Sequence, residues 1–340
     1  MAALGRSLAR AAREGAKAAA LGLGRRIAHR AAEGRGPVAR FSTIPGTKAV
    51  PLGSIGPIGP DRLPVYVDWN KFGAVTPVQD QGNCGGCWAF SCTALIEAAN
   101  FFSTKKLLKL SEQHLIDAND LRNYGCDGGS IGEGLDYVVK NGGQLLEKDY
   151  PYVGVQCPAK RITAFGVTID GYETFQGLNE IALKMLVASG PVAATVGVDE
   201  SFLDYQYSGV GKVLDGHNYS LEEMRRLENQ LSILIIGYGE TIFGEKFWLV
   251  KSSHGGELML IARENGKAGG AFGIANHLRV VHKNSANGLV TVKTDKDMGV
   301  SPRVQSCVKS HFSQLPFIEF LLSSLVSPHC VQSCVTALHP

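Results

Sequence analysis

Apolar residues in the first part of this 340-residue chain recur with the spacing of helices. Residues 87–102 are rich in Ala, Phe, Leu and Ile and contain neither Gly nor Pro, a pattern that predicts a buried helix. Ile131, Leu135 and Val139 recur at every fourth position and predict a second helix. We therefore expect the region after residue 87 to be mainly helical.

Strand-like runs dominate the later part of the chain, from residue 162 to residue 283. Short apolar runs there, such as 192–198 and 232–236, are punctuated by Gly and predict strands. The stretch 63–284, about 220 residues, is long enough to bury two separate cores. The pattern thus predicts a helical half followed by a strand-rich half.

Positive charge is concentrated at the N-terminal end. Residues 1–48 hold ten Lys or Arg and two acidic residues, a net charge of +8, whereas the whole chain carries +3, so the remainder sums to −5. Arg6, Arg10, Arg13 and Lys17 follow a helical repeat and acidic residues are scarce, which favours a mitochondrial or plastid transit peptide. A disordered leader without a targeting role is the alternative. We expect no nucleic-acid partner, because no aromatic pattern or fold signature supports one.

Two further segments flank the central region. Residues 49–62 are rich in Gly and Pro, which is typical of a linker. Residues 285–340 form a tail without an assigned function, and its apolar run Phe317–Val326 is too short to span a bilayer. We therefore expect no membrane span.

The run Q-G-N-C-G-G-C-W, from Gln81 to Trp88, carries the clearest chemistry in the sequence. Cys87 opens the first predicted helix, where unpaired N–H groups and the helix dipole favour the thiolate, the nucleophilic form of cysteine. The side-chain amide of Gln81 is a candidate donor to the oxyanion of a tetrahedral intermediate. These residues predict acyl transfer with Cys87 as the nucleophile.

Cys84 and Cys87 also form a C-x-x-C pair, which occurs in redox motifs and in zinc sites. A zinc site needs a second pair at similar spacing, and the remaining cysteines provide none nearby. A thioredoxin-like motif follows a strand in a βαβ unit, which is not what precedes this pair. We therefore expect no metal and no cofactor.

The same run resembles the papain family of cysteine peptidases, whose local signature is C-G-[SA]-C-[WY], with Gly86 as a mild departure. Further family-like motifs follow in family order: Asp68-Trp69, Leu110–Gln113, Gly125–Gly129, Gly190–Val192, Gly237–Gly239 and Phe247–Lys251. The resemblance covers about residues 63–284 and points to plant-type or cathepsin-like members. It implies an α+β papain-like fold, with a helical lobe at about 63–161, a β-barrel-like lobe at 162–284 and the substrate cleft between them.

The resemblance also assigns substrate contacts. Gly128 and Gly129 match the glycines of the groove floor, where missing side chains let a peptide backbone approach. Ser130 and Ile131 would then edge the pocket that sets side-chain preference. A simple tight turn is the alternative for the two glycines.

Cys84 and Cys126 match the positions of a family disulfide, which would form in an oxidising compartment. Cys157 resembles half of a second bridge whose partner is missing, so we expect it to be single. Family members normally follow the secretory path to the vacuole, the lysosome or the outside. That location disagrees with the mitochondrial or plastid location predicted from residues 1–48.

Two partners of the family nucleophile are replaced here. The base histidine lies six residues before the first Gly of the G-Y-G turn, and this position is Leu231. The asparagine that orients it follows the F-W-L-V-K strand, and this position is Ser252. The W-G-x-x-G-Y stretch that normally follows is missing. His217, in a polar loop, and His254, at the family tryptophan position, are the alternative bases.

We therefore expect a pseudopeptidase, a monomer that binds an extended peptide or protein segment in its cleft without efficient turnover. Residual oxyanion stabilisation would support only slow reactions of activated esters. The competing hypothesis is an active cysteine peptidase that uses His254 or His217 as its base. A third hypothesis is a product whose missing segments prevent stable folding.

Overall fold

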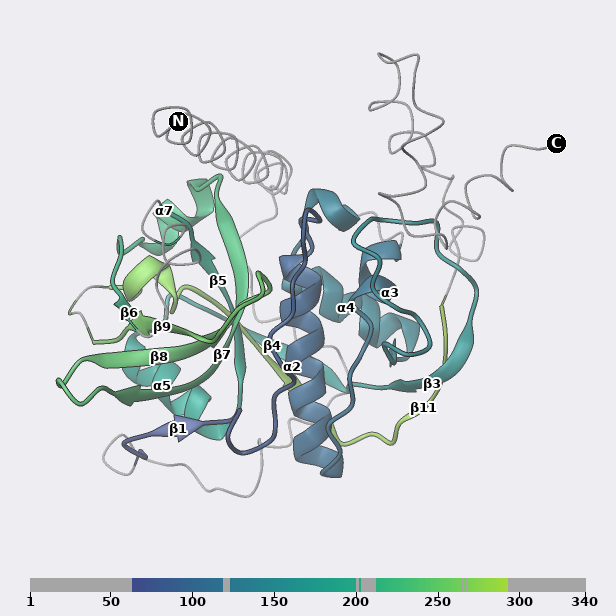
Figure 1. Cartoon of the computed structure of the whole chain (residues 1–340), viewed down its shortest axis with the longest axis horizontal. Coiled ribbons are helices and arrows are strands. Elements are labelled where there is room, and N and C mark those ends of the chain that lie inside the picture. The colour runs from purple at the N-terminus through teal and green to yellow at the C-terminus, as the bar shows by residue number, and fades with distance from the viewer. Residues whose placement is uncertain are drawn as a thin grey trace, which may run out of the picture.

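A computed structural model describes residues 63–118, 123–199, 202, 212–264, 266 and 268–292 of the chain. Helix α2 (Cys87–Thr104) crosses the middle of the molecule, with a large sheet on one side and α3 (Glu112–Asp117) and α4 (Ile131–Asn141) on the other (Figure 1). Thirteen of the 18 residues of α2 are buried, as its largely apolar sequence requires. The two helices predicted from apolar spacing are confirmed by α2 and α4.

Local sequence fixes the ends of the shorter helices. Ser111 is the N-cap of α3, and its hydroxyl accepts a hydrogen bond of 3.0 Å from the N–H of His114. Helix α4 ends at Asn141 because Gly142 adopts a left-handed conformation with φ of 79°. These two residues therefore fix where α3 begins and where α4 ends.

The larger sheet forms what we call the β lobe. Its strands follow the order β4-β10-β5-β7-β8-β9-β6. Their bounds are β4 (Gly171–Gln176), β10 (His277–His282), β5 (Val192–Gly197), β7 (Gln230–Glu240), β8 (Lys246–Lys251), β9 (Met259–Ala262) and β6 (Val213–Leu214). Helix α5 (Glu180–Ser189) packs against β7, and α7 (Leu221–Arg226) directly precedes β7 in the chain. Strands β5 and β7 confirm the two predicted apolar strand runs.

Both ends of the described chain cross over to the opposite lobe. Strand β1 (Val67–Asp68) precedes the helices yet pairs with β7 in the β lobe. A second sheet of order β11-β3-β2 lies on the helical side (Figure 1). Its strands are β2 (Gln144–Leu145), β3 (Thr163–Val167) and β11 (Gly288–Thr291). We call the helices α2 to α4 with this small sheet the helical lobe.

These pairings correct the boundaries predicted from the sequence. Strand β3 lies beyond the predicted lobe boundary at 161 but belongs to the helical lobe. Strand β11 lies beyond the predicted end of the domain at 284, and Val290 and Val292 are buried in a small apolar cluster with Leu145. The folded unit therefore continues into the segment 285–340.

A chain of buried polar groups joins the two lobes. Nζ of Lys251, on β8, donates to Oγ1 of Thr76 at 2.8 Å, and Thr76 donates to Oε2 of Glu97 on α2 at 2.6 Å. Nζ of Lys109 lies 3.5 Å from Glu97 and 2.6 Å from Glu112 at the start of α3. Because Glu97 and Glu112 are each 1% exposed, these charges depend on one another for solvation.

The leader 1–48, the linker 49–62 and residues 293–340 lie outside the described residues, so the statements made about them stay predictions. In the described part of the chain, no helix is both long enough and apolar enough to cross a membrane. Across the same ranges, His, Cys, Asp and Glu side chains form no group suited to holding a metal ion.

Candidate active site

Cys87 is the first residue of α2, and only 4% of it is exposed. Gly86 is the N-cap residue and has no side chain to cap the first turn, so the helix terminus acts on the thiol directly. Polar groups of Ser232 and the backbone of Cys87 and Trp88 lie near the thiol and favour its thiolate form. Burial raises the pKa of Cys87, and these polar groups offset the effect only in part.

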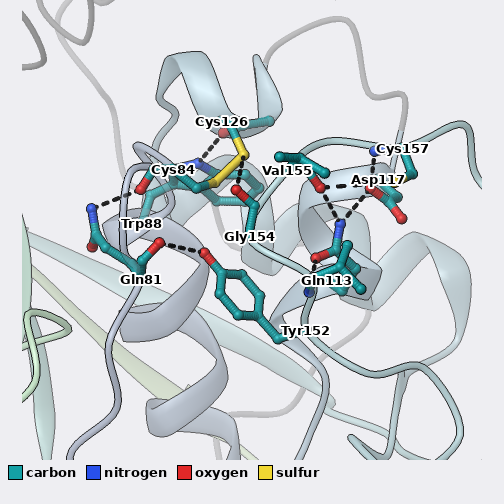
Figure 2. The surroundings of a disulfide bond; sticks show 12 residues. Gln81, Cys84, Trp88, Gln113, Asp117, Cys126, Tyr152, Gly154, Val155 and Cys157 are labelled. Atoms are coloured by element: carbon teal, nitrogen blue, oxygen red, sulfur yellow. Dashed lines mark hydrogen bonds between the residues drawn. A yellow bond between two sulfur atoms is a disulfide. The ribbon is translucent and has the colours of Figure 1, made fainter. Parts of the chain in front are cut away.

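Gln81 is held rigidly beside the helix start. Its Nε2 donates to the carbonyl of Cys84 at 2.9 Å, and its Oε1 accepts from the hydroxyl of Ser253. Its backbone carbonyl accepts from the hydroxyl of Tyr152 at 2.7 Å, as Figure 2 shows. An amide nitrogen carries two hydrogens and the bond to Cys84 uses one. The second has no acceptor among the described residues, and its predicted role towards an oxyanion stays a prediction.

A disulfide bond between Cys84 and Cys126 is present, as the family resemblance implies. It ties the loop before α2 to the loop before α4, and the N–H of Gly85 also donates to the carbonyl of Cys126 at 2.8 Å (Figure 2). Cys157 was expected to be single, but it is disulfide-bonded, so that prediction is wrong. The sequence motif did not reveal its partner, because disulfide connectivity depends on the fold.

The glycine loop before α4 packs tightly on the start of α2. Gly128 adopts φ of 115°, a value that favours glycine. A Cβ atom at Gly129 would lie 2.5 Å from Oδ1 of Asn123 and 2.8 Å from the ring of Trp88. Gly129 and Ser130 are exposed on this loop. Their contact with a peptide stays a prediction, as does that of Ile131, which is 3% exposed.

Leu231 is the second residue of β7 and pairs with Val196 of β5. It is 5% exposed and belongs to the same apolar cluster as Cys87. An aliphatic side chain can neither accept nor donate a proton, so Leu231 cannot act as a general base. The neighbouring Ser232 lies beside the thiol and favours its thiolate form, and sequence reasoning missed it. Its only signal is that it adjoins the position predicted for the base.

Ser252 follows β8 directly and is 6% exposed. It lines a cavity on the flank of α2 whose other lining residues are Gln79, Phe90, Ser91, Ala94, Leu234, Lys251 and Ser253. The neighbouring Ser253 supports Gln81 through two contacts, its hydroxyl to Oε1 and its carbonyl to the N–H of Gln81 at 2.7 Å. The end of β8 thus stabilises the predicted oxyanion donor.

The two alternative histidines, His254 and His217, have different surroundings. His254 forms a backbone bridge with Asp80, and its Nδ1 is buried without a hydrogen-bond partner among the described residues. Burial lowers the pKa of His254, and the charge of Asp80 opposes this. The ring of His217 lies 4.5 Å from that of Tyr219. Among the described residues, neither imidazole is one of the groups that most strongly affect the pKa of Cys87.

Comparison with known proteins places this geometry in context. A family model described as "Papain family cysteine protease" matches residues 63–261. Cysteine endopeptidase RepA of Oryza sativa subsp. japonica is 38% identical over 219 residues, which are 63% of this chain and 55% of that protein. Vignain of Ricinus communis is 37% identical over 241 residues, 69% of this chain and 64% of that protein. The chain therefore spans less than two thirds of the length of these relatives.

Solved structures show the same fold. A ragweed pollen cysteine protease in its proform aligns with a TM-score of 0.57 at 35% identity, covering 69% of this chain and 70% of that chain. A cysteine protease of Carica candamarcensis in complex with E-64 aligns with a TM-score of 0.56 at 34% identity, covering 66% of this chain and all of that one (100%). The predicted α+β two-lobe fold is confirmed by these alignments.

Proposed function

This chain belongs to the papain family of cysteine proteases, and we propose that within it the protein is a non-catalytic homologue that binds an extended peptide. The nucleophile Cys87 and the oxyanion donor Gln81 are kept, whereas Leu231 and Ser252 stand at the positions predicted for the base and its orienting asparagine. The proposal therefore separates binding, which the retained loops support, from turnover, which needs the replaced residues.

One observation carries this proposal: the thiol of Cys87 is buried, with Ser232 among the polar groups beside it, and burial raises its pKa. A cysteine paired with histidine in such a site titrates at about pH 3–4, against about 8.5 for a free one, a difference of about 6 kcal/mol. A helix terminus contributes about 0.3–1 kcal/mol, and about 2 kcal/mol at most. Cys87 is therefore mostly a thiol at neutral pH.

Amide cleavage suffers a second loss, because the same imidazole would also protonate the departing amine. Gln81 still offers an N–H to an oxyanion, and such stabilisation together with binding is worth roughly 10³–10⁴ over water. That factor is enough for slow reactions of activated esters. It is far below what peptide hydrolysis requires, since enzymes typically accelerate reactions by about 10⁶-fold or more.

The binding half of the proposal depends on the loop from Gly128 to Ile131. Glycines without side chains let an extended peptide approach the protein backbone, and main-chain pairing of this kind gives affinity that depends little on sequence. Ser130 and Ile131 would then contact one side chain of the peptide. Asn123 and Trp88 lie so close to Gly129 that a Cβ atom there would clash, so this position needs glycine.

The experiment compares hydrolysis of a peptidyl-amide reporter by the wild-type full chain and by Cys87→Ala. Cys92→Ala is the matched control, because Cys92 is a second buried free thiol on the same helix. We expect no turnover that depends on Cys87, while labelled extended peptides bind to all three proteins in fluorescence anisotropy. Turnover that disappears only in Cys87→Ala contradicts the proposal.

Active peptidase chemistry through a displaced base is the second candidate function, favoured by the unpartnered Nδ1 of His254. It predicts that His254→Ala abolishes reporter hydrolysis while His217→Ala, in the loop beside Tyr219, leaves it intact, or the reverse. Circular dichroism and a cooperative urea transition separate both candidates from a chain that fails to fold.

A further inference from the structure

Arg279 faces the start of helix α4 from the β lobe. It lies on β10, where it pairs with Ala193 of β5 and Thr174 of β4. A Cβ atom added to Gly132, the second residue of α4, would stand 3.3 Å from Nε and 3.4 Å from Nη2 of Arg279. The guanidinium group therefore lies directly against the first turn of the helix.

This guanidinium has few partners. Its Nη1 donates to the carbonyl of Leu278 at 2.9 Å, whereas its Nε is buried and has no hydrogen-bond partner among the described residues. The carboxylates of Glu133 and Asp136 act on Arg279 through their charge, but neither forms an ion pair with it in the described part of the chain. One oxygen of Asp136 accepts from the hydroxyl of Tyr172 instead. A buried N–H donor without an acceptor is costly, so an acceptor supplied from outside to the Nε–H group would be stabilised here.

The start of α4 favours an anion at the same place. The helix has 11 residues, and its N-cap residue Ser130 makes no capping hydrogen bond through its side chain. First-turn N–H groups without a side-chain acceptor and the positive end of the helix dipole attract negative charge. Ser130 is exposed, which leaves the site open to a ligand. Burial, with the charges of Arg279 and Arg225, lowers the pKa of His277 to about 4, so this neighbour is neutral at pH 7.

We propose that Arg279, Ser130 and the first turn of α4 form a carboxylate site that selects an Asp or Glu side chain of the bound peptide. The inference rests on the proposed peptide-binding function, because Ser130 directly follows the predicted groove floor at Gly129. A peptide lying along the two glycines directs one side chain past Ser130 towards the guanidinium. A carboxylate can accept two parallel N–H bonds from arginine there, whereas a neutral amide cannot.

The test uses labelled alanine-based hexapeptides in which Glu or Gln replaces one position at a time, with binding to the full chain measured by fluorescence anisotropy. We expect Glu to bind at least about tenfold more tightly than Gln at one position, the effect of a charge-assisted hydrogen bond. Arg279→Gln should abolish the difference. Arg226→Gln is the matched control and should keep it, because Arg226 is 77% exposed on α7.

A second variant guards against misfolding of Arg279→Gln. Ser130→Asp changes an exposed N-cap residue, where Asp is well tolerated, and places a competing carboxylate in the site. It should also abolish the preference for Glu. Equal binding of Glu and Gln to the wild type at every position overturns the inference, and so does a preference that persists in both variants.

Failure of the proposed function gives a different result. If no hexapeptide binds, the peptide-binding proposal is wrong, and the carboxylate site is tested alone with N-acetylglutamate amide against N-acetylglutamine amide. The first compound should raise the melting temperature of the wild type and not that of Ser130→Asp. If the two compounds act alike on the wild type, the carboxylate site is absent as well.

Discussion

Introducing a histidine at position 231 is expected to shift the titration of Cys87 strongly towards acid. In the wild type, burial raises the pKa of Cys87, so the pH of half-maximal alkylation by iodoacetamide should lie above about 8.5. In the double variant Leu231→His with Ser252→Asn, the new imidazolium would stabilise the thiolate. The titration midpoint should therefore move to lower pH.

The size of the shift follows from the contributions at the site. Full pairing with an imidazolium is worth four to five pH units, or about 6 kcal/mol, whereas a helix terminus alone supplies about 2 kcal/mol at most, roughly 1.5 pH units. Because Leu231 is only 5% exposed, the new imidazolium must lose most of its hydration. This desolvation opposes its charge, so we expect a shift of at least about two pH units rather than the full value.

The assay follows alkylation against pH, with peptide mapping by mass spectrometry to separate Cys87 from Cys92, a second buried free thiol among the described residues, and from the remaining cysteines. The midpoint is measured rather than the rate, because the intrinsic nucleophilicity of a thiolate falls as its pKa falls. Ser252→Asn alone is the control and should leave the midpoint unchanged. A wild-type midpoint near pH 4, or no shift in a double variant that melts cooperatively, refutes the reasoning.

Three further predictions concern stability, each measured by urea denaturation. Burial raises the pKa of Asp117 to about 7, from an ordinary value of 3.8. The stabilisation from the neutral carboxyl group is complete below about pH 4 and is lost as the pH rises through 7. Over this range the free energy of unfolding should fall by about 4 kcal/mol relative to that of Asp117→Asn. A difference between the two proteins that does not change with pH contradicts this. Replacing Cys84 and Cys126 by Ser should lower the free energy of unfolding by about 4 kcal/mol, because their bond closes a loop with a sequence separation of 42. The loss of stability that a reductant causes in the wild type by breaking this bond should be absent from the variant. Glu97→Ala removes a buried carboxylate that accepts from the hydroxyl of Thr76 and from the N–H of Leu110. Leaving both buried donors unsatisfied should lower the free energy of unfolding by about 2–5 kcal/mol; a loss below about 1 kcal/mol would show that water replaces the carboxylate.

Long periodic elements could be predicted from the sequence, whereas short strands could not. Helix α2 follows from an apolar run free of Gly and Pro, and β5 and β7 follow from apolar runs of the expected length. Strands β1 and β2 have two residues each, too few for alternation to appear. Strand β11 forms by pairing Leu289 with Phe165, a contact between distant segments that no local pattern encodes.

The residues of the candidate site show the same contrast between local motifs and contacts that depend on the fold. Cys87 and Gln81 lie in one contiguous motif, so their neighbourhood could be predicted from the sequence alone. Ser232 and Arg279 could not, because what they face depends on the pairing of β5 with β7 and β10. Strand register decides which side chains meet across a sheet, and a single sequence gives no direct signal of it.

Leu231 and the serines Ser232 and Ser253 fit the interior around Cys87 and Gln81, which bears on whether the chain is a binding module or an unstable product. Leu231 fills the apolar cluster around Cys87 instead of leaving a polar void. Ser232 lies beside the thiol and favours its thiolate form, and the hydroxyl of Ser253 donates to the side-chain oxygen of Gln81. Unpartnered buried polar groups cost about 1–3 kcal/mol each, so this arrangement favours stable folding without the catalytic pair. It also means that restoring a base must displace contacts that now stabilise the site, and recovered activity should therefore come at the expense of stability.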